Sequence, residues 1–199
     1  MTVAAPALAE LAVTPAQRAR RQRIVDAALE LALGGYDAVQ MREVAVRADV
    51  ALGTLYRYFP SKVHLLVAAM AEQLERIREL AVGSAPATGE PTERVMQVIR
   101  ALTDYLGANP NLSAAMVRAL MFADGSVAPD VDRVSAIMTS IISTATHGTT
   151  EPTEADTVAA QIIGKVLLAD IVSWLGERMT PAEMLESIDR TVDIVLAPR

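Results

Sequence analysis

Residues 41–62 read MREVAVRADVALGTLYRYFPSK, the most informative stretch of the chain. Its apolar spacing predicts a short helix over 41–48 and a second one over 53–59, joined by a tight turn and ended by a proline. In the second helix Leu55 and Phe59 are four positions apart, so both should face a core. The polar and aromatic side chains around them are then left to point outward.

A longer helix is predicted on each side of this pair. Thr14 supplies an N-cap hydroxyl, Pro15 stands at the first helical position, and Gln17 can reach back to the cap, so a helix should run over 15–33. Ser61 caps the next long helix. Two short helices between longer ones have the proportions of a helix-turn-helix, whose second helix lies in the major groove of DNA. The side chains predicted to point outward from that helix are Thr54, Tyr56, Arg57 and Tyr58.

The rest of the chain also reads as helices. No stretch shows the sustained apolar and polar alternation of a strand, so the predicted fold class is all-α. The Gly, Ser, Pro and Thr content of 83–91 is typical of a connecting loop. Further helices are expected over 61–82, 92–106, 110–122, 129–146, 155–178 and 181–196.

Composition excludes several classes of protein. The chain has 199 residues, 52% of them apolar, which is enough for a hydrophobic core. It has no cysteine, so disulfides, thiolate metal sites and a cysteine nucleophile are excluded. No Lys or Arg precedes the apolar residues at the start, as a secretory signal would require. We therefore expect a cytoplasmic protein without a membrane partner.

The charge is unevenly distributed. The whole chain carries 18 basic and 24 acidic side chains, a net charge of -6, which by itself argues against nucleic acid as a partner. Residues 1–64, however, hold eight basic and six acidic side chains, whereas residues 65–199 hold ten and eighteen. Four arginines fall within 18–23 without an intervening acid. The basic share therefore lies where the helix-turn-helix is predicted.

The same stretch resembles the signature of TetR-family transcriptional repressors. The resemblance rests on the ordered Ala, Val, Gly-Thr-Leu-Tyr, Tyr-Phe and Ser-Lys elements of 41–62 and implies the fold of that family. Gln40, Asp49 and Ala51 depart from the usual Ser or Thr, Gly and Ser, so Asp49 must tolerate the turn geometry and the helix after Ala51 lacks a capping hydroxyl. The residues that the resemblance places on DNA are Gln40, Arg42, Leu52, Gly53, Thr54, Tyr56, Arg57, Tyr58 and Lys62.

The resemblance also implies a domain order. We expect a flexible N-terminal extension over 1–14, a three-helix DNA-binding domain over 15–60 and a helical effector-binding and dimerisation domain over 61–199. Within the family, Ser-Lys-Val-His-Leu-Leu at 61–66 is similar to actinobacterial repressors of cholesterol catabolism, which implies a steroid acyl-CoA intermediate as inducer. A fatty acyl-CoA or a drug is the alternative effector.

The second half supports a dimer independently of the resemblance. From 159 to 175 apolar residues wrap beyond one helical stripe, so this helix should be buried on more than one side. Lys165 and Asp170 lie near its centre and disfavour a membrane span. Packing against a second copy explains the pattern, with the helix over 181–196 completing a four-helix interface. A symmetric homodimer would read a palindromic operator in double-stranded DNA.

Apolar side chains in the second half are candidates for the wall of an effector pocket, although residues at helical spacing are more often ordinary core. An anionic group on the effector would need a local arginine, with Arg118, Arg133 and Arg178 as candidates. The candidate wall residues are Tyr105, Leu106, Met116, Leu120, Met121, Phe122, Ile137, Met138, Ile141 and Trp174.

Two other classes of function fit the sequence less well. An enzyme acting on an acyl substrate would have only His64 and His147 as imidazole bases, and the chain has no Gly-x-Ser-x-Gly, His-Glu-x-x-His or phosphate-loop motif. We therefore expect no enzymatic activity, no cofactor and no metal. A ligand-binding module without DNA affinity is disfavoured by the intact Tyr56, Tyr58 and Lys62.

Overall fold

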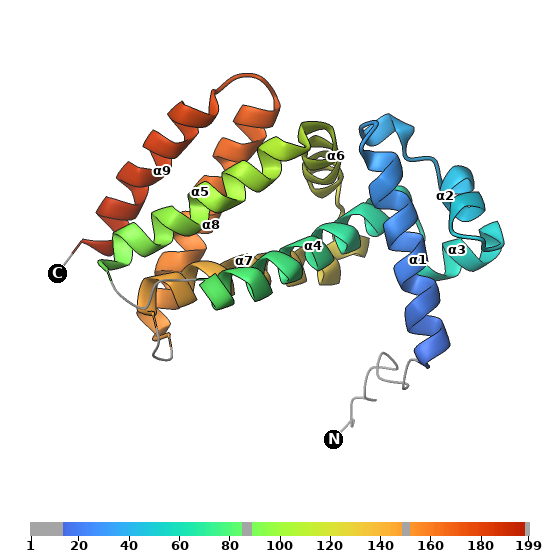
Figure 1. The fold of residues 1–199 in the computed structure, drawn as a ribbon, viewed down its shortest axis with the longest axis horizontal. Coiled ribbons are helices and arrows are strands. Elements are labelled where there is room, and N and C mark those ends of the chain that lie inside the picture. Colours follow the sequence, from blue (N-terminus) through green and yellow to red (C-terminus); the bar gives the residue numbers. More distant parts are fainter. Residues whose placement is uncertain (1–13, 85–88, 149–151, 198–199) are drawn as a thin grey trace.

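A computed structural model describes residues 14–84, 89–148 and 152–197. Every regular element in these ranges is a helix, which confirms the predicted all-α class (Figure 1). The elements are α1 (Pro15–Ala32), η2 (Tyr36–Ala38), α2 (Met41–Arg47), α3 (Leu52–Tyr58), α4 (Lys62–Ser84), α5 (Pro91–Ala108), α6 (Pro110–Met121), η3 (Gly125–Val127), α7 (Ala128–His147), α8 (Glu154–Leu175) and α9 (Pro181–Leu196).

The helices form two bundles joined by α4. In Figure 1 α1–α3 lie at one end, which we call the N-terminal bundle, and α5–α9, the C-terminal bundle, extend to the other end. The long α4 runs between them and packs on α1 as well as on α6 and α7. A displacement of α4 would therefore change packing contacts in both bundles.

Most helix ends follow their sequence signals. The predicted capping boxes of α1 and α9 are present, with Thr14 paired to Gln17 and Thr180 to Glu183. α8 has a third capping box that was not predicted, formed by Thr153 and Asp156. The predicted extension over 1–14 lies outside the described residues except for Thr14, which caps α1.

Three predicted helix ends were wrong by two or three residues, among them that of α5, which ends at Ala108 rather than 106. α8 ends at Leu175 rather than 178, because Glu177 has a left-handed φ of 58° and the N–H of Arg178 donates to the carbonyl of Ser173. α4 continues through Ser84, two residues into the predicted loop. The two 3-10 turns were also not predicted, since three residues carry no measurable period.

The N-terminal bundle has a small but fully closed core. Ile24 and Val25 of α1, Val44 of α2 and Leu55 of α3 are each 0% exposed. Leu65 of α4 is also 0% exposed, so the long helix contributes to this core. At roughly 25 cal/mol per Å² of buried apolar surface, such side chains contribute about 2 kcal/mol each. The two short helices are held in place by this core rather than by their own length.

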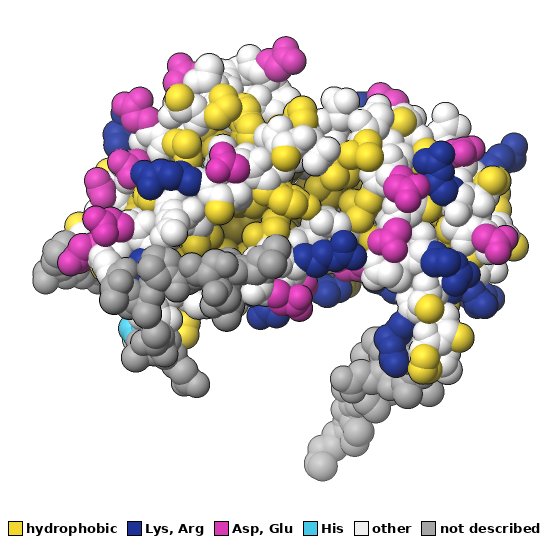
Figure 2. Space-filling model, viewed as in Figure 1, with side chains coloured by type: hydrophobic (Ala, Val, Ile, Leu, Met, Phe, Trp, Pro, Cys, Tyr) yellow, Lys and Arg dark blue, Asp and Glu magenta, His cyan; other side chains and the backbone are white. Residues whose placement is uncertain are grey.

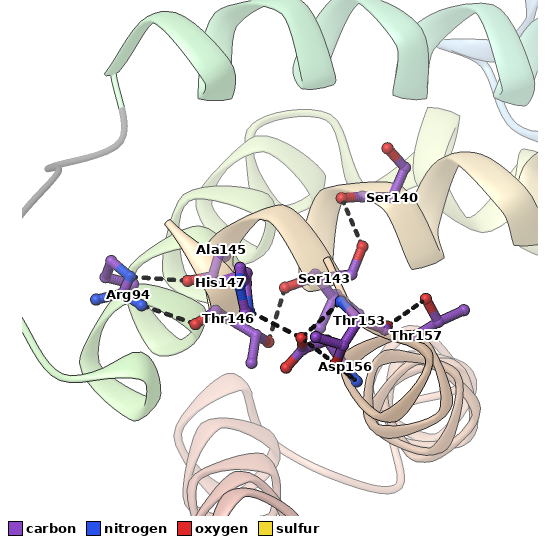
Figure 3. A network of polar contacts seen from close by, with 10 residues as sticks. Arg94, Ser140, Ser143, Ala145, Thr146, His147, Thr153, Asp156 and Thr157 are labelled. Carbon is purple, nitrogen blue, oxygen red and sulfur yellow. Dashed lines mark hydrogen bonds and ion pairs between the residues drawn. The ribbon is translucent and has the colours of Figure 1, made fainter. Parts of the chain in front are cut away.

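The C-terminal end of α7 is held by side chains from α5 and α8 (Figure 3). Arg94 of α5 donates to the carbonyl oxygens of Ala145 at 2.9 Å and Thr146 at 2.7 Å, and also to that of Gly89. These carbonyls lie in the last turn of α7, where a cation is favoured by the helix dipole. His147 Nδ1 lies 2.8 Å from Asp156 Oδ2. Arg94 thus links α5 to the C-terminal end of α7.

α8 is the one described helix that is long and apolar enough to cross a membrane by length and composition. In the fold it packs along α7 and α9, with Ile163, Leu167 and Ile171 buried. Its opposite face carries Val158, 49% exposed, and Ile162, 45% exposed. The single chain therefore covers only part of the apolar surface that the sequence predicted to be buried on more than one side.

Candidate nucleic-acid interface

The turn between α2 and α3 accounts for an unusual residue in the sequence. Asp49 adopts a left-handed φ of 52° and donates its N–H to Val46 O at 3.2 Å, while Val50 N–H donates to Ala45 O at 3.0 Å. These two bonds form a Schellman motif, which satisfies the last carbonyls of α2. Asp tolerates this conformation better than most residues, and the expectation for Asp49 is confirmed.

α3 presents the side chains around its core anchors to the outside. Leu55 and Phe59 are buried, as predicted from their spacing. Tyr56 is 45% exposed and Arg57 is exposed. Thr54 and Tyr58 are half-buried, and the Tyr58 ring packs against the core. A hydroxyl, a phenol and a guanidinium thus share the open side of one short helix.

Gly53 is a glycine that the folded chain does not require. Its φ is not positive, and a Cβ added there would meet no atom within 4 Å. Glycine inside a helix costs about 1 kcal/mol relative to alanine. Because nothing within the chain occupies that space, the position is suited to the close approach of another molecule.

The remaining predicted DNA residues surround α3. Gln40 and Arg42 are exposed at the start of α2, and the Gln40 side chain makes no capping hydrogen bond. Leu52 is half-buried against the core. The Ala51 cap likewise lacks a side-chain hydrogen bond, as its sequence predicted.

Lys62 is held by a residue of the turn before α2. Its ammonium donates to the carbonyl oxygen of Tyr36 at 3.1 Å and lies 3.9 Å from the centroid of the Tyr36 ring. Burial lowers the pKa of Lys62, the Asp37 carboxylate acts in the opposite direction, and the Arg118 charge adds to the lowering. The amine is therefore positioned by protein contacts before any DNA is present.

Arg21 and Arg23, in the arginine cluster of α1, make contacts inside the fold. Arg21 pairs with Glu72 of α4 and lies 5.2 Å from the Phe59 ring centroid. Arg23 Nε donates to Ala48 O at 3.3 Å. The sequence shows that these arginines cluster but not which of them are occupied, because their partners lie 25 or more positions away.

The N-terminal bundle meets the C-terminal bundle through Arg118 of α6. Its Nη1 lies 3.2 Å from Asp37 Oδ2, and its guanidinium carbon lies 4.6 Å from the Tyr36 ring centroid and 5.6 Å from that of Phe122. The Tyr36 ring thus contacts both the Lys62 ammonium and the Arg118 guanidinium. Sequence reasoning missed Tyr36 and Asp37, since their partner on α6 is 81 positions from Asp37.

The predicted effector-wall residues fall into three groups by exposure. Met116 is 3% exposed yet stands apart from the buried side chains that pack into the contiguous core. Phe122 lies at the contact with Tyr36, with the ring centroids 6.0 Å apart. Leu106, Met116, Leu120, Ile137 and Ile141 are buried, Met138 and Trp174 are half-buried, and Tyr105, Met121 and Phe122 are exposed.

The arginines considered for an anionic group differ in their surroundings. Arg118 contacts Asp37, Arg133 lies 4.0 Å from Glu75, and Arg178 is exposed after α8. One buried carboxylate oxygen, Asp170 Oδ2 in α8, has no hydrogen-bond partner among the described residues. Within those same residues no group of acidic or histidine side chains is placed to hold a metal ion.

A short helix held rigidly by a closed core, with a free polar and aromatic face, defines a helix-turn-helix DNA-binding protein. Comparison with protein families agrees. The model described as "Bacterial regulatory proteins, tetR family" matches residues 24–69, and the one described as "Tetracyclin repressor-like, C-terminal domain" matches residues 89–195. The chain belongs to the TetR family, as its sequence signature predicted, and is a transcriptional repressor of that family.

Three known proteins are similar to this chain. The HTH-type transcriptional repressor KstR of Rhodococcus jostii (strain RHA1) is 46% identical over 98% of this chain and 92% of its own. A crystal structure of a TetR transcriptional regulator from Rhodococcus sp. RHA1 is 37% identical, with a TM-score of 0.82 over 91% of this chain and 97% of that one. Thermus thermophilus FadR in complex with lauroyl-CoA shares the fold, with a TM-score of 0.70 and 20% identity over 88% and 93% of the two chains.

Proposed function

We propose that this repressor binds a palindromic operator as a homodimer through α3 and leaves it when a small apolar effector binds the C-terminal bundle. The observation that carries the proposal is the free face of α3, where Gly53, Tyr56 and Arg57 lie over a fully buried core. Such a helix fits the major groove without rearrangement.

The predicted residues divide between base edges and phosphates. Arg42 and Arg57 are exposed and can reach base edges or backbone, and the exposed Gln40 amide can contact DNA as well. Thr54, Tyr56 and Tyr58 offer hydroxyls to phosphates, and Lys62 adds a charge. Leu52 and Gly53 allow the backbone of α3 to approach closely.

A homodimer follows from the apolar face that one chain leaves open. Val158 and Ile162 on α8 are about half exposed, and Ile194 on α9 is 78% exposed. Pairing α8 and α9 with the same helices of a second copy would cover them in a four-helix interface. The two copies of α3 would then read half-sites about 34 Å apart, which requires a palindrome.

The effector we propose is a steroid acyl-CoA of cholesterol catabolism. Supporting this are the 46% identity to a repressor named KstR and the buried Met116, a flexible side chain suited to a bulky apolar ligand. A fatty acyl-CoA is the second candidate, because a protein of the same fold holds lauroyl-CoA. Either ligand arises in the cytoplasm, where we place this non-enzymatic regulator.

Release requires that the effector bind the operator-free arrangement more tightly than the operator-bound one. The contacts of Arg118 offer the route, because they join α6 to Tyr36 and Asp37, and Tyr36 in turn holds Lys62. A shift of α6 or α4 would move Lys62 and α3 in each subunit. The spacing of the two α3 helices would then no longer match the groove.

The test begins with genomic fragments that the full-length chain selects, followed by mobility-shift titrations on one of them. Tyr56→Ala should weaken binding at least about tenfold through lost phosphate and stacking contacts. Arg100→Ala, an exposed arginine of α5, is the matched control and should leave affinity unchanged. A non-palindromic selected sequence, or full affinity of the Tyr56 variant, would refute the proposed interface.

Effector identity is tested in the same assay. A steroid acyl-CoA should release the operator at lower concentration than lauroyl-CoA, since a rigid fused-ring body buries more apolar area against the C-terminal bundle. Release by lauroyl-CoA alone would replace the first candidate with the second. If neither ligand released the operator, both candidate effectors would be excluded.

A further inference from the structure

A hollow with an apolar floor opens between α4 and α5. Figure 2 shows hydrophobic side chains at its base and Lys or Arg side chains on its α4 side. Both helices pack on α6 and α7, which hold them as the two walls of the hollow. Direct packing between α4 and α5 is slight by comparison.

The floor and walls can be assigned from helical spacing. On α4, Met70 and Ile77 share a face with Gln73, because residues three and four apart lie on one side of a helix. On α5, Leu102 shares a face with Tyr105 in the same way. Met70 and Ile77 are half-buried and Leu102 is 6% exposed. Apolar side chains thus share these helix faces with the two polar ones.

The two polar side chains meet across the hollow. Tyr105 Oη donates to Gln73 Oε1 at 2.7 Å, and this is the hydrogen bond that joins α4 to α5 among the described residues. Tyr105 is 37% exposed, and desolvation raises the pKa of its hydroxyl. A hydrogen bond between neutral groups contributes only about 1 kcal/mol net, so thermal motion opens it readily.

A cation stands beside this bridge. Arg76 follows Gln73 by one helical turn on α4, and its charge lowers the pKa of Tyr105, against the larger effect of burial. The guanidinium lies 3.9 Å from Asp26 of α1, and both side chains are about half exposed. Such a pair is weak and can be exchanged for another anion. Residues 65–199 carry eighteen acidic and ten basic side chains. An anionic ligand therefore needs a local cation in this region, and Arg76 supplies one.

From these contacts we infer that the hollow between α4 and α5 is the entrance for the effector, that the Tyr105–Gln73 bridge closes it, and that Arg76 binds the anionic end of an amphipathic ligand. The apolar body of the ligand passes beneath the bridge, while its charged end stays at the rim in contact with water and Arg76. The inference rests on the proposed binding of an effector by the C-terminal bundle. It explains how an acidic region accepts an anion.

The role of Arg76 is tested with two fluorescent probes that share their rings. 1-Anilinonaphthalene-8-sulfonate carries an anionic group, and N-phenyl-1-naphthylamine lacks it. Arg76→Gln should weaken the sulfonate probe by up to about fivefold, as expected for an exposed ion pair, and leave the neutral probe unchanged. Arg78→Gln, which instead loses a contact to Glu75 on the same helix, should change neither. Equal effects on both probes, or no binding of either to the unaltered chain, would overturn the assignment.

The role of the bridge is tested by closing it covalently. The chain has no cysteine, so a Gln73→Cys, Tyr105→Cys variant offers only two thiols to a short bismaleimide. Cross-linking should slow uptake of the neutral probe at least about tenfold, since the ligand must pass between α4 and α5. The same variant before cross-linking should take up the probe no more slowly than the unaltered chain. An unchanged uptake rate after cross-linking would show that the entrance lies elsewhere.

Operator binding without effector separates this inference from the proposed function. The Arg76 variant should retain operator affinity, because it changes no residue of α3 and loses only a weak exposed pair; the cross-linked variant is left out of this comparison, since it fixes α4, which joins the two bundles. If the unaltered chain did not bind an operator, the proposed function would be refuted and the probe results would still stand. Retained operator affinity with unaltered probe behaviour would refute only the entrance.

Discussion

The two short helices of the N-terminal bundle and the last two helices of the C-terminal bundle begin in different ways. In the N-terminal bundle α2 and α3 have seven residues each, and their N-caps Gln40 and Ala51 provide no side-chain hydrogen bond. In the C-terminal bundle α8 and α9 have 22 and 16 residues and begin with complete capping boxes. α2 and α3 therefore depend on the buried side chains beneath them, whereas α8 and α9 also carry their own N-terminal signals.

The difference corresponds to what each bundle has to do. α3 must present a fixed face to DNA, and a core with side chains at 0% exposure allows it one position. For the C-terminal bundle we proposed a ligand, and there the capping boxes hold the starts of α8 and α9 while a hollow stays open between α4 and α5. The two regions differ in how their helices begin and not in depth of burial, because Ile163, Met184 and Ile188 are also 0% exposed.

The largest expected effect comes from breaking the closed core. Leu55→Ala should destabilise the N-terminal bundle by about 3 kcal/mol, because a fully buried leucine leaves a cavity that a small bundle cannot fill. Operator binding should be lost at a temperature at which Trp174, the single tryptophan, still reports a folded C-terminal bundle. Simultaneous loss of both signals would show that α4 makes the two bundles one cooperative unit.

A smaller loss of stability is expected at a helix end of the C-terminal bundle. Arg94→Met removes the donors to three carbonyl oxygens near the end of α7 and the start of α5, which should cost about 2 kcal/mol. The measurement is urea unfolding followed by Trp174 fluorescence. Arg100→Met changes an exposed arginine of the same helix and should be neutral. Equal losses for the two variants would show that the loss is not specific to the Arg94 contacts.

Sequence reasoning succeeded where a signal is local. The capping boxes at Thr14 and Thr180, the core positions Leu55 and Phe59, and the strained turn at Asp49 all follow from residues within a few positions of each other. A local pattern fixes a helix and the face it buries, and the family signature adds the identity of the outward residues.

Contacts between helices far apart in the sequence could not be found in this way. The Tyr105–Gln73 bridge spans 32 positions, and the pairing of Arg118 with Asp37 spans 81. Phe122 illustrates the limit, because its apolar side chain was a candidate for the effector wall, yet it lies against Tyr36 at the junction of the bundles. Only the packing of α6 against η2 decides between those two places.

A smaller effect separates stability from binding within the N-terminal bundle. Gly53→Ala should raise stability by about 1 kcal/mol, because alanine favours the helix and an added Cβ meets no atom of the chain. The same methyl should weaken operator binding, since it fills the space left for DNA. Ala51→Ser, which restores a capping hydroxyl, should also add about 1 kcal/mol but leave affinity unchanged. Unchanged affinity of the Gly53 variant in a mobility shift would contradict the proposed close approach.

The smallest expected effect is a pH dependence confined to the C-terminal bundle. The Thr180 N–H, aided by its hydroxyl, holds the pKa of Glu183 below its ordinary value, and the Thr153 hydroxyl followed by its N–H does the same for the pKa of Asp156. A pKa lowered by folding means that the stabilisation is present above the unfolded value, about 4 for these carboxyls, and disappears as pH falls through the folded value. The capping box of α1 uses Gln17, which does not titrate.

Acidification should therefore weaken the caps of α8 and α9 and spare that of α1. Melting curves followed by Trp174 fluorescence between pH 7 and about pH 3 should show a decline that Glu183→Gln reduces, because glutamine keeps the cap geometry without a proton to gain. An equal decline in that variant would assign the acid sensitivity to other carboxylates. The distinction between the uncapped α2 and α3 and the capped α8 and α9 would then have no electrostatic part.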